Sequence, residues 1–301
     1  MEVFFNQKME NITFIVNPIA GANTSLKRFD ALKAFIIEHG VPYSVKYTEY
    51  SGHASVLATE AFERGEKNIV SVGGDGTFRE IASVLFNKPV SLGILPFGTG
   101  NDLARALHIP FLGKDALDII YRGKTRSMDL GQANGEFFTN IAGFGFDTQV
   151  LENTQKFKGR FKGMFPYLLG VFKAFWHLTP IQMKISAANK IIKLNAVLIA
   201  VGNGTHFGGG MMVTPKADPF DGLFDVCVVH AVNRLTFLRL FPSFIKGNSD
   251  AMPIEYFRTS WVSVKCEGRS YSLNLDGELQ NQTPVLIKIL PGALNVFIGE
   301  D

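Results

Sequence analysis

Three short glycine-containing motifs in the first third of the chain limit what it can fold into. They are NPIAG (residues 17–21), GGDGT (73–77) and FGTGND (97–102), and each follows a short apolar run. Short apolar runs predict buried strands, and the segments between them have the apolar spacing of helices. This alternation predicts a parallel sheet with helices on both faces. Because ligands bind at the carboxyl ends of parallel strands, we expect the three motifs to meet at one edge of that sheet.

The GGDGT motif is typical of a loop that binds a phosphate. Its glycines would let backbone N–H groups approach the ligand, and the N-terminus of the helix expected over residues 80–86 would favour negative charge. A P-loop needs a lysine and then a serine or threonine after its last glycine, which this motif lacks, and it is not GxGxxG either. The motif therefore predicts a phosphate site of another kind.

The pattern of the chain changes near residue 125. From there it consists mostly of short strand-like runs separated by turns, which predicts an antiparallel sandwich or barrel. We therefore predict an α/β nucleotide-binding domain with a parallel sheet at residues 1–128 and a β-rich second domain at residues 129–290. Two stretches with helical spacing, 161–178 and 234–247, interrupt the second domain.

The composition excludes several classes of protein. The 301 residues are 46% hydrophobic and 19% charged, which is typical of a globular protein. The net charge of +3 gives no argument for a nucleic-acid partner, and the two cysteines belong to no metal-binding Cys/His cluster. We find no secretory signal and no run that approaches the about 18–20 apolar residues of a membrane helix. We expect a cytoplasmic protein that contacts membranes from their surface.

Taken together, the motifs of both predicted domains resemble those of a known family. NPIAG, SVGGDGTFRE and LPFGTGNDLAR are followed in order by NIAGFGFD (140–147), DPFDGLFD (218–225) and LDGE (275–278). This series is similar to the signatures of the diacylglycerol kinase catalytic family, which includes bacterial soluble lipid kinases. The resemblance implies an N-terminal domain that binds ATP and a β-rich domain that carries the lipid site. It also implies that residues 291–301 return to the first domain.

The resemblance implies where the nucleotide binds. Asp75 repels phosphate, so it makes more sense as a ligand, direct or through water, of the Mg²⁺ that accompanies ATP; the alternative is that it only braces the turn. Glu80 would reach a ribose or a metal-bound water, or else be a solvated residue of a first helical turn. The nucleotide contacts implied are Asn17, Thr48, Gly73, Gly74, Asp75, Gly76, Thr77, Glu80, Thr99 and Asn101.

One position in the phosphate motif departs from the family pattern. Arg79 stands where the bacterial members usually have an asparagine. A cation there could contact phosphate or point to solvent.

The general base of the reaction is expected in the LDGE motif. Asp276 and Glu278 flank Gly277, and the family pattern makes one of the two carboxylates the acceptor of the lipid hydroxyl proton. A turn with Gly between the two carboxylates can present both near one point. If the strand continued through the motif instead, both side chains would lie on the same face. The sequence does not separate the two, and exposed turn carboxylates are the alternative.

The resemblance also implies a second, structural Mg²⁺ in DPFDGLFD. Its ligands would be Asp218, Asp221 and the carbonyl oxygen of Leu223, since hard cations take carboxylate and carbonyl oxygens. The alternative is an Asp-Gly turn between two strands. The stretches 161–178 and 234–247 combine apolar stripes with Lys and Arg, which suits an anionic membrane surface, although such stripes also bury against a domain.

The leading hypothesis is an ATP- and Mg²⁺-dependent lipid kinase, most simply one that converts diacylglycerol to phosphatidic acid. The alternatives are an NAD kinase-like enzyme and a non-catalytic lipid-binding regulator. The expected partners are a lipid alcohol and a membrane surface. The sequence names neither the acceptor lipid nor the oligomeric state, and a homodimer is one of the states considered.

Overall fold

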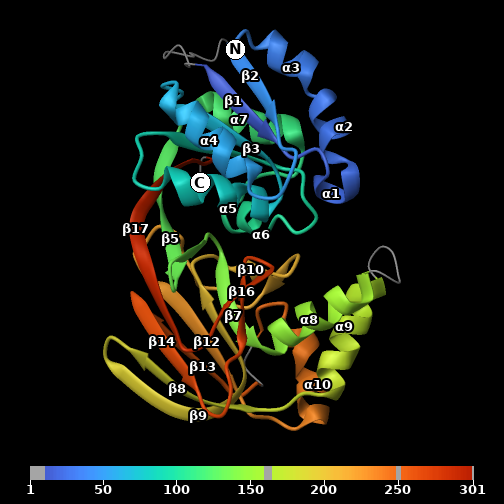
Figure 1. Ribbon diagram of the computed structural model, residues 1–301, viewed down its shortest axis with the longest axis vertical. Coiled ribbons are helices and arrows are strands. Elements are labelled where there is room, and N and C mark those ends of the chain that lie inside the picture. The colour runs from blue at the N-terminus through green and yellow to red at the C-terminus, as the bar shows by residue number, and fades with distance from the viewer. Residues whose placement is uncertain (1–10, 159–164, 249–251, 300–301) are drawn as a thin grey trace. The chain divides into compact units, whose positions relative to one another are not determined.

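The computed structural model describes residues 11–158, 165–248 and 252–299 (Figure 1). The chain divides into two compact units. Unit 1 comprises Met1–Leu130 and Pro291–Asp301, and unit 2 comprises Gly131–Leu290.

Unit 1 is built on a parallel sheet, as the strand and helix alternation predicts. Its strands are β1 (Ile12–Val16), β2 (Tyr43–Tyr47), β3 (Asn68–Gly73), β4 (Ser91–Pro96) and the end of β17 (Val285–Phe297). Their order is β2-β1-β3-β4-β17, and every neighbouring pair is parallel. All residues of β1 are buried, as befits a strand covered on both faces.

The helices of unit 1 differ in two places from what the sequence predicts. The helical stripe over residues 25–40 is divided between two short helices, because the N–H of Leu32 bonds the carbonyl of Phe29 in a tighter turn. The helix after the GGDGT motif begins at Asp75 and so takes in the motif's last residues. The helices are α1 (Ala20–Asn23), α2 (Ser25–Asp30), α3 (Lys33–Glu38), α4 (His53–Glu63), α5 (Asp75–Leu85), α6 (Asp102–Ala106) and α7 (Gly113–Arg122).

Unit 2 is β-rich and antiparallel, as predicted. The strands are β5 (Thr125–Ala133), which enters from unit 1, β6 (Glu136–Phe138), β7 (Ile141–Gly145), β8 (Ile181–Ala187), β9 (Lys190–Gly202), β10 (His206–Phe207), β11 (Met211–Met212), β12 (Phe224–His230), β13 (Ile254–Thr259), β14 (Trp261–Cys266), β15 (Ser272–Leu275), β16 (Glu278–Gln282) and the start of β17. One path through the sheet runs β16-β15-β7-β9-β8-β14-β17, and β12 pairs with both β9 and β13.

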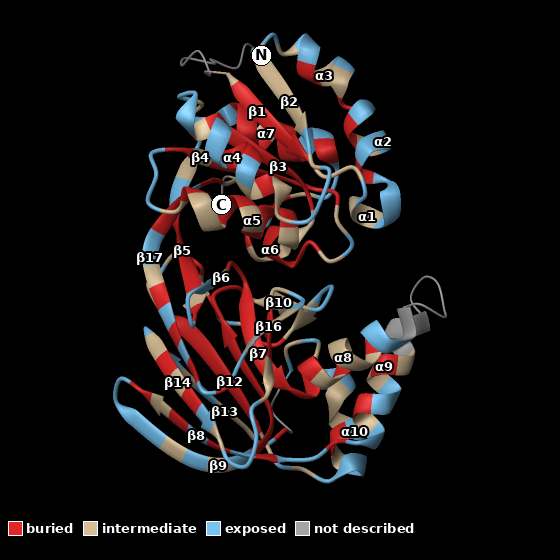
Figure 2. Ribbon diagram, in the orientation of Figure 1, coloured by how far each residue is buried: buried red, intermediate tan, exposed pale blue. Residues whose placement is uncertain are grey.

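The sheet of unit 2 has a core on each face. Along β12, Val226 and Val228 join one buried cluster while Cys227 and Val229 join the other, which is the alternation of a strand buried on both sides. Figure 2 shows β7 and β12 coloured as buried along most of their length. The second cluster is completed by three helices, α8 (Phe146–Lys158), α9 (Phe165–Trp176) and α10 (Arg234–Phe244).

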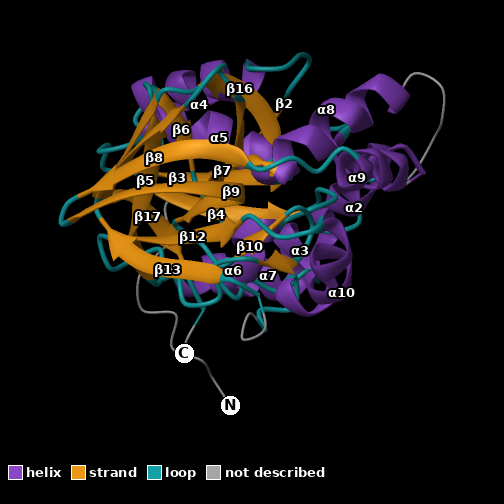
Figure 3. Ribbon diagram, turned by 90° about the horizontal axis from the view of Figure 1, so that it is seen from below, coloured by secondary structure: helices purple, strands orange, loops and turns teal. Residues whose placement is uncertain are grey.

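These three helices gather at one side of the sheet of unit 2 (Figure 3). They include the described parts of the two predicted helical stretches; residues 159–164 lie outside the described residues. Across the described residues, no helix is both long and apolar enough to span a bilayer.

Candidate active site

The three glycine-containing motifs meet at the carboxyl edge of the parallel sheet in unit 1. The amide of Asn17, just after β1, donates to the hydroxyl of Thr77 at 3.1 Å. Gly73 at the end of β3 lies so close to both that a Cβ there would be 2.7 Å from the Thr77 hydroxyl. The NPIAG and GGDGT motifs are therefore in direct contact.

The FGTGND motif touches both of the others. A Cβ on Gly98 would lie 2.3 Å from the Cα of Gly74, and a Cβ on Gly21 would lie 2.3 Å from the carbonyl oxygen of Phe97. Gly21 also has a φ of +59°, which glycine adopts most easily. The meeting of the motifs at one sheet edge thus depends on glycine at these contacts.

Asp75 joins two of the motifs through its carboxylate. One oxygen accepts the N–H of Asp102 at 3.1 Å and the other accepts the N–H of Leu103 at 3.0 Å. These N–H groups have no partner within α6, and an acidic group near a helix N-terminus is favoured electrostatically. Bracing, one of the two roles considered for Asp75, is therefore present in the structure.

Asn101 shapes the FGTGND loop from within. Its side chain accepts the N–H of Gly98 at 2.9 Å and donates to the carbonyl of Gly98 at 3.0 Å. Asn101 is buried with a φ of +53°, whereas Thr99 is exposed. Of these two predicted contacts, Thr99 presents its side chain to solvent and Asn101 holds the loop.

Glu80 holds the segment that follows β2. Its carboxylate accepts the N–H of Gly52 at 2.9 Å and the N–H of Ala54 at 3.1 Å, at the start of α4. Thr48 lies on this segment, and its N–H bonds the carbonyl of Val16 at 2.9 Å. Glu80 thus fixes the loop beside Thr48, a role that the sequence did not suggest.

Arg79 is only 8% exposed. Of the two alternatives for this position, a side chain pointing to solvent is ruled out. Asp102 is 8% exposed and forms the first turn of α6.

In unit 2, the LDGE motif forms a hairpin turn rather than a continuous strand. Strand β15 ends at Leu275 and β16 begins at Glu278, and these two residues pair directly. Asp276 and Gly277 have φ values of +51° and +91°, as in the type I′ turns that Asp-Gly favours. Of the two arrangements considered, a turn and a continuing strand, the structure has the turn, and the chain reverses between the two carboxylates.

The two carboxylates of the turn have different surroundings. One oxygen of Asp276 accepts the N–H and the hydroxyl of Thr139 at 2.6 and 2.9 Å. The other accepts the N–H groups of Asn140 and Ile141, both at 2.9 Å. Four donors match the lone-pair sites of a carboxylate. Glu278 is exposed. The sequence missed the 139–141 segment as the partner of Asp276, although NIAGFGFD belongs to the motif series.

The DPFDGLFD segment holds its carboxylates by other contacts. Asp218 accepts the N–H of Phe220 at 3.1 Å, and Asp221 accepts the N–H of Leu223 at 2.9 Å. Asp221 also forms an ion pair with Arg258. Among the described residues there is no group of three or more His, Cys, Asp or Glu side chains that could hold a metal. As arranged here, Asp221 would have to exchange Arg258 for a cation.

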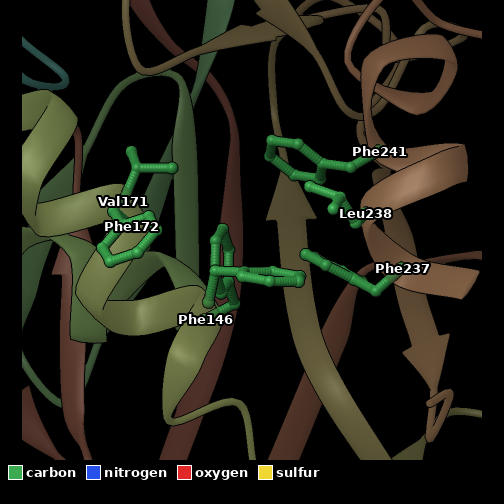
Figure 4. A pocket seen from close by; sticks show the side chains of 7 residues that line it. Phe146, Val171, Phe172, Phe237, Leu238 and Phe241 are labelled. Carbon is green, nitrogen blue, oxygen red and sulfur yellow. The ribbon is translucent and has the colours of Figure 1, made fainter. Parts of the chain in front are cut away.

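The helices of unit 2 enclose an apolar pocket of about 190 Å³ (Figure 4). It is lined by Phe146, Val171, Phe172, Phe175, Phe237, Leu238 and Phe241. Part of each apolar stripe is buried, as with Phe237 at 1%, and part is not: Phe172 is 63% and Leu238 55% exposed. Each predicted stripe therefore has a buried part and an exposed part.

Each of the two units matches a known protein-domain family. Residues 11–133 match the diacylglycerol kinase catalytic domain. Residues 140–298 match the YegS C-terminal NAD kinase beta sandwich-like domain. The chain belongs to the diacylglycerol kinase catalytic family. It is therefore a kinase, and the resemblance drawn from the motifs is confirmed.

Relatives of this diacylglycerol kinase family match over nearly the whole chain. A protein of Mycobacterium tuberculosis named "Diacylglycerol kinase" is 30% identical, with 95% of this chain and 94% of the relative covered. A protein of Pseudomonas fluorescens named "Probable lipid kinase YegS-like" is 33% identical, with 87% of each covered. A crystal structure described as a diacylglycerol kinase from Bacillus anthracis has the same fold, with a TM-score of 0.72, 23% identity and 98% of each chain covered.

The close packing of the loops makes Gly98 a sensitive position. We predict that Gly98→Ala weakens ATP binding at least tenfold, because the added methyl must push Gly74 and its N–H out of place. A fluorescent ATP analogue would measure the affinity, and circular dichroism would confirm the fold. Leu112→Ala, at an exposed position of the same unit, is the control; equal affinities for both variants would contradict the loop packing.

Proposed function

We propose that this kinase transfers the γ-phosphate of ATP to the hydroxyl of a lipid, most simply of diacylglycerol to give phosphatidic acid. The observation that carries the proposal is the packing of three glycine-containing loops at the carboxyl edge of the parallel sheet in unit 1. That packing places backbone N–H groups at a strand-to-helix junction, the arrangement that binds phosphate. The names of the relatives support a lipid acceptor.

The residues of unit 1 would bind and orient the nucleotide. The N–H groups of Gly73, Gly74 and Gly76 and the hydroxyl of Thr77 suit the phosphates, and Thr48 and Asn17 lie at neighbouring strand ends. A Mg²⁺ bound with ATP would neutralise charge on the transferred phosphoryl group. Asp75 is the residue proposed to bind that ion, through water, because its carboxylate also accepts two N–H groups of α6.

A carboxylate of the LDGE turn would accept the hydroxyl proton of the lipid. The hydroxyl oxygen bonds to the γ-phosphorus, the bond from phosphorus to the leaving oxygen of ADP breaks, and the hydroxyl proton passes to a carboxylate. Glu278 has the exposed carboxylate, whereas both oxygens of Asp276 already accept two hydrogen bonds each. We therefore assign proton transfer to Glu278 and the shape of the turn to Asp276.

The test is transfer of labelled phosphate from ATP to lipids in mixed micelles. Diacylglycerol, monoacylglycerol, a sphingoid base, phosphatidylglycerol and undecaprenol would be offered, with NAD as the alternative acceptor. We expect label in a lipid. Label in NAD would support the NAD kinase reading, and no transfer while ATP still binds would support a non-catalytic regulator.

Two carboxylate variants separate the roles within the turn. We predict that Glu278→Gln lowers kcat at least a hundredfold with little change in melting temperature, since it removes the base at an exposed position where the glutamine can still accept the hydrogen bond from the amide of Gln280. Asp276→Asn replaces an acceptor with a donor facing N–H groups, so it should cost about 1–3 kcal/mol of unfolding free energy as well as activity. Full activity in Glu278→Gln, with activity abolished in Asp276→Asn, would reverse the assignment.

The exposed face of α9 and α10 is proposed to contact an anionic membrane. Phe172 and Trp176 of α9 and Leu235 and Leu238 of α10 are all more than half exposed. Lys173, Arg234 and Arg239 are exposed beside them, and neither helix contains an acidic residue. Apolar side chains flanked by cations suit a surface rich in anionic lipids.

We predict that Phe172→Asp with Leu238→Asp lowers binding to phosphatidylglycerol vesicles tenfold or more, because each buried side chain contributes about 1.5–3 kcal/mol. Co-sedimentation measures this. Ile191→Asp, an equally exposed apolar position on β9, is the matched control. The proposal fails if the control loses binding and the double variant does not. Light scattering on the same samples would show whether the chain forms the homodimer considered from its sequence.

A second Mg²⁺ at Asp218, Asp221 and the carbonyl of Leu223 is the remaining proposal for unit 2. Because Arg258 competes for Asp221, we predict that Mg²⁺ raises the melting temperature more in Arg258→Met than in the wild-type protein. Asp218→Asn should abolish this difference. If Mg²⁺ does not change the melting temperature of any of the three proteins, this segment does not bind the ion.

A further inference from the structure

A buried carboxylate lies in unit 2 that the proposed chemistry does not use. Asp147 is in the first turn of α8 and is only 6% exposed. Its Oδ1 is buried without a hydrogen-bond partner among the described residues. A carboxylate placed this way lowers the stability of a fold, because burial penalises its charged form.

The other oxygen of Asp147 connects to the LDGE turn through one residue. The side-chain amide of Asn274 donates from Nδ2 to Oδ2 of Asp147 at 3.2 Å. The Oδ1 of the same amide accepts the N–H of Gly277 at 2.8 Å. Asn274 is fully buried, so water cannot replace either of these hydrogen bonds to its amide.

The geometry points to Asp147 as a positioning residue that acts through Asn274 to hold the Asp276–Gly277 turn, and with it the carboxylate of Glu278. The inference rests on the proposed function, in which Glu278 takes the proton. As long as Asp147 accepts from Nδ2, the amide of Asn274 must present its oxygen to Gly277. If the amide turned over, Gly277 would face an NH₂ group instead of an acceptor.

The protonation of Asp147 decides which arrangement is favoured. Burial raises the pKa of Asp147 to about 7, although N–H groups at the start of α8 and the amide of Asn274 partly lower it. The ionised form can only accept, which fixes the amide of Asn274. The neutral acid can also donate, so it can pair with the oxygen of Asn274 and release Gly277. The turn is therefore held best above pH 7.

Neighbouring charged side chains do not set the pKa of Asp147. The ionisable side chains on the described parts of α8 and of the elements packed against it are Glu152, Lys156, Lys173, Lys190, Lys193, Arg234, Arg239 and Glu278. None of them is among the causes that set the pKa of Asp147.

Folding stability should respond to pH in the opposite direction to activity. The pKa of Asp147 is raised in the folded protein above its ordinary value of 3.8, so the folded state holds a proton that the unfolded state has lost. The contribution of this group to stability is full below pH 3.8 and falls as pH rises towards 7. Asp147 would therefore lower the stability of the fold above pH 7, where activity is expected to be highest. A residue with a purely structural role would not show this opposition between stability and activity.

The experiment compares Asp147→Asn with Glu152→Gln, which removes a charge from the same helix and, among the described residues, alters the contact with Ser272 at 3.1 Å. The wild-type protein and the Glu152→Gln variant should show a kcat for diacylglycerol phosphorylation that rises through about pH 7. Asp147→Asn should have a flat profile with kcat about tenfold lower at pH 8 and KM for ATP unchanged. Its melting temperature relative to the wild type should rise between pH 5 and pH 8.

Hydrogen exchange at Gly277 tests the contact without any activity. Corrected for the intrinsic rate, its N–H should be more protected in the wild-type protein than in Asp147→Asn at pH 8. If no lipid is phosphorylated but this protection differs, the proposed function fails and the positioning stands. If diacylglycerol is phosphorylated with the same pH profile in both proteins, or Gly277 is equally protected in both, the positioning role is overturned.

Discussion

The contact between Gly74 and Gly98 is the constraint on which the proposed nucleotide site depends. A side chain at position 98 would separate the end of β3 from the end of β4, since a Cβ on Gly98 would lie 2.3 Å from the Cα of Gly74. With the two glycines in contact, Asp75 reaches the start of α6 and Thr77 reaches Asn17. In the proposed site, backbone groups rather than long side chains would face the ligand. Such groups need little reorganisation when a phosphate binds.

Three carboxylates beside the motifs hold backbone N–H groups. Asp75 holds α6, Glu80 holds the start of α4, and Asp276 holds the segment at 139–141. In each case a charged acceptor satisfies donors that the local secondary structure leaves unpaired, which gives stronger bonds than neutral acceptors would. The exposed Glu278 is different, and this difference supports a chemical role for it.

Much of the fold and part of the site were predictable from the sequence. Apolar runs ending in glycine motifs were enough to predict the parallel sheet and the meeting of its loops, because strand ends in such a sheet share an edge. What could not be predicted were contacts set by tertiary packing. Glu80 reaches back to α4, and Asp276 turns towards residues more than a hundred positions earlier. The turn at Asp-Gly could be predicted, because this pair favours a hairpin, but the residues that bond the carboxylate of Asp276 could not.

The most direct test of the account is hydrogen exchange in the presence of a non-hydrolysable ATP analogue with Mg²⁺. The account predicts that exchange slows in the peptides covering residues 17–21, 73–77 and 97–102 together, and that NAD at the same concentration leaves them unchanged. Protection of only one of the three segments, or equal protection by NAD, would contradict a nucleotide site formed by the three loops.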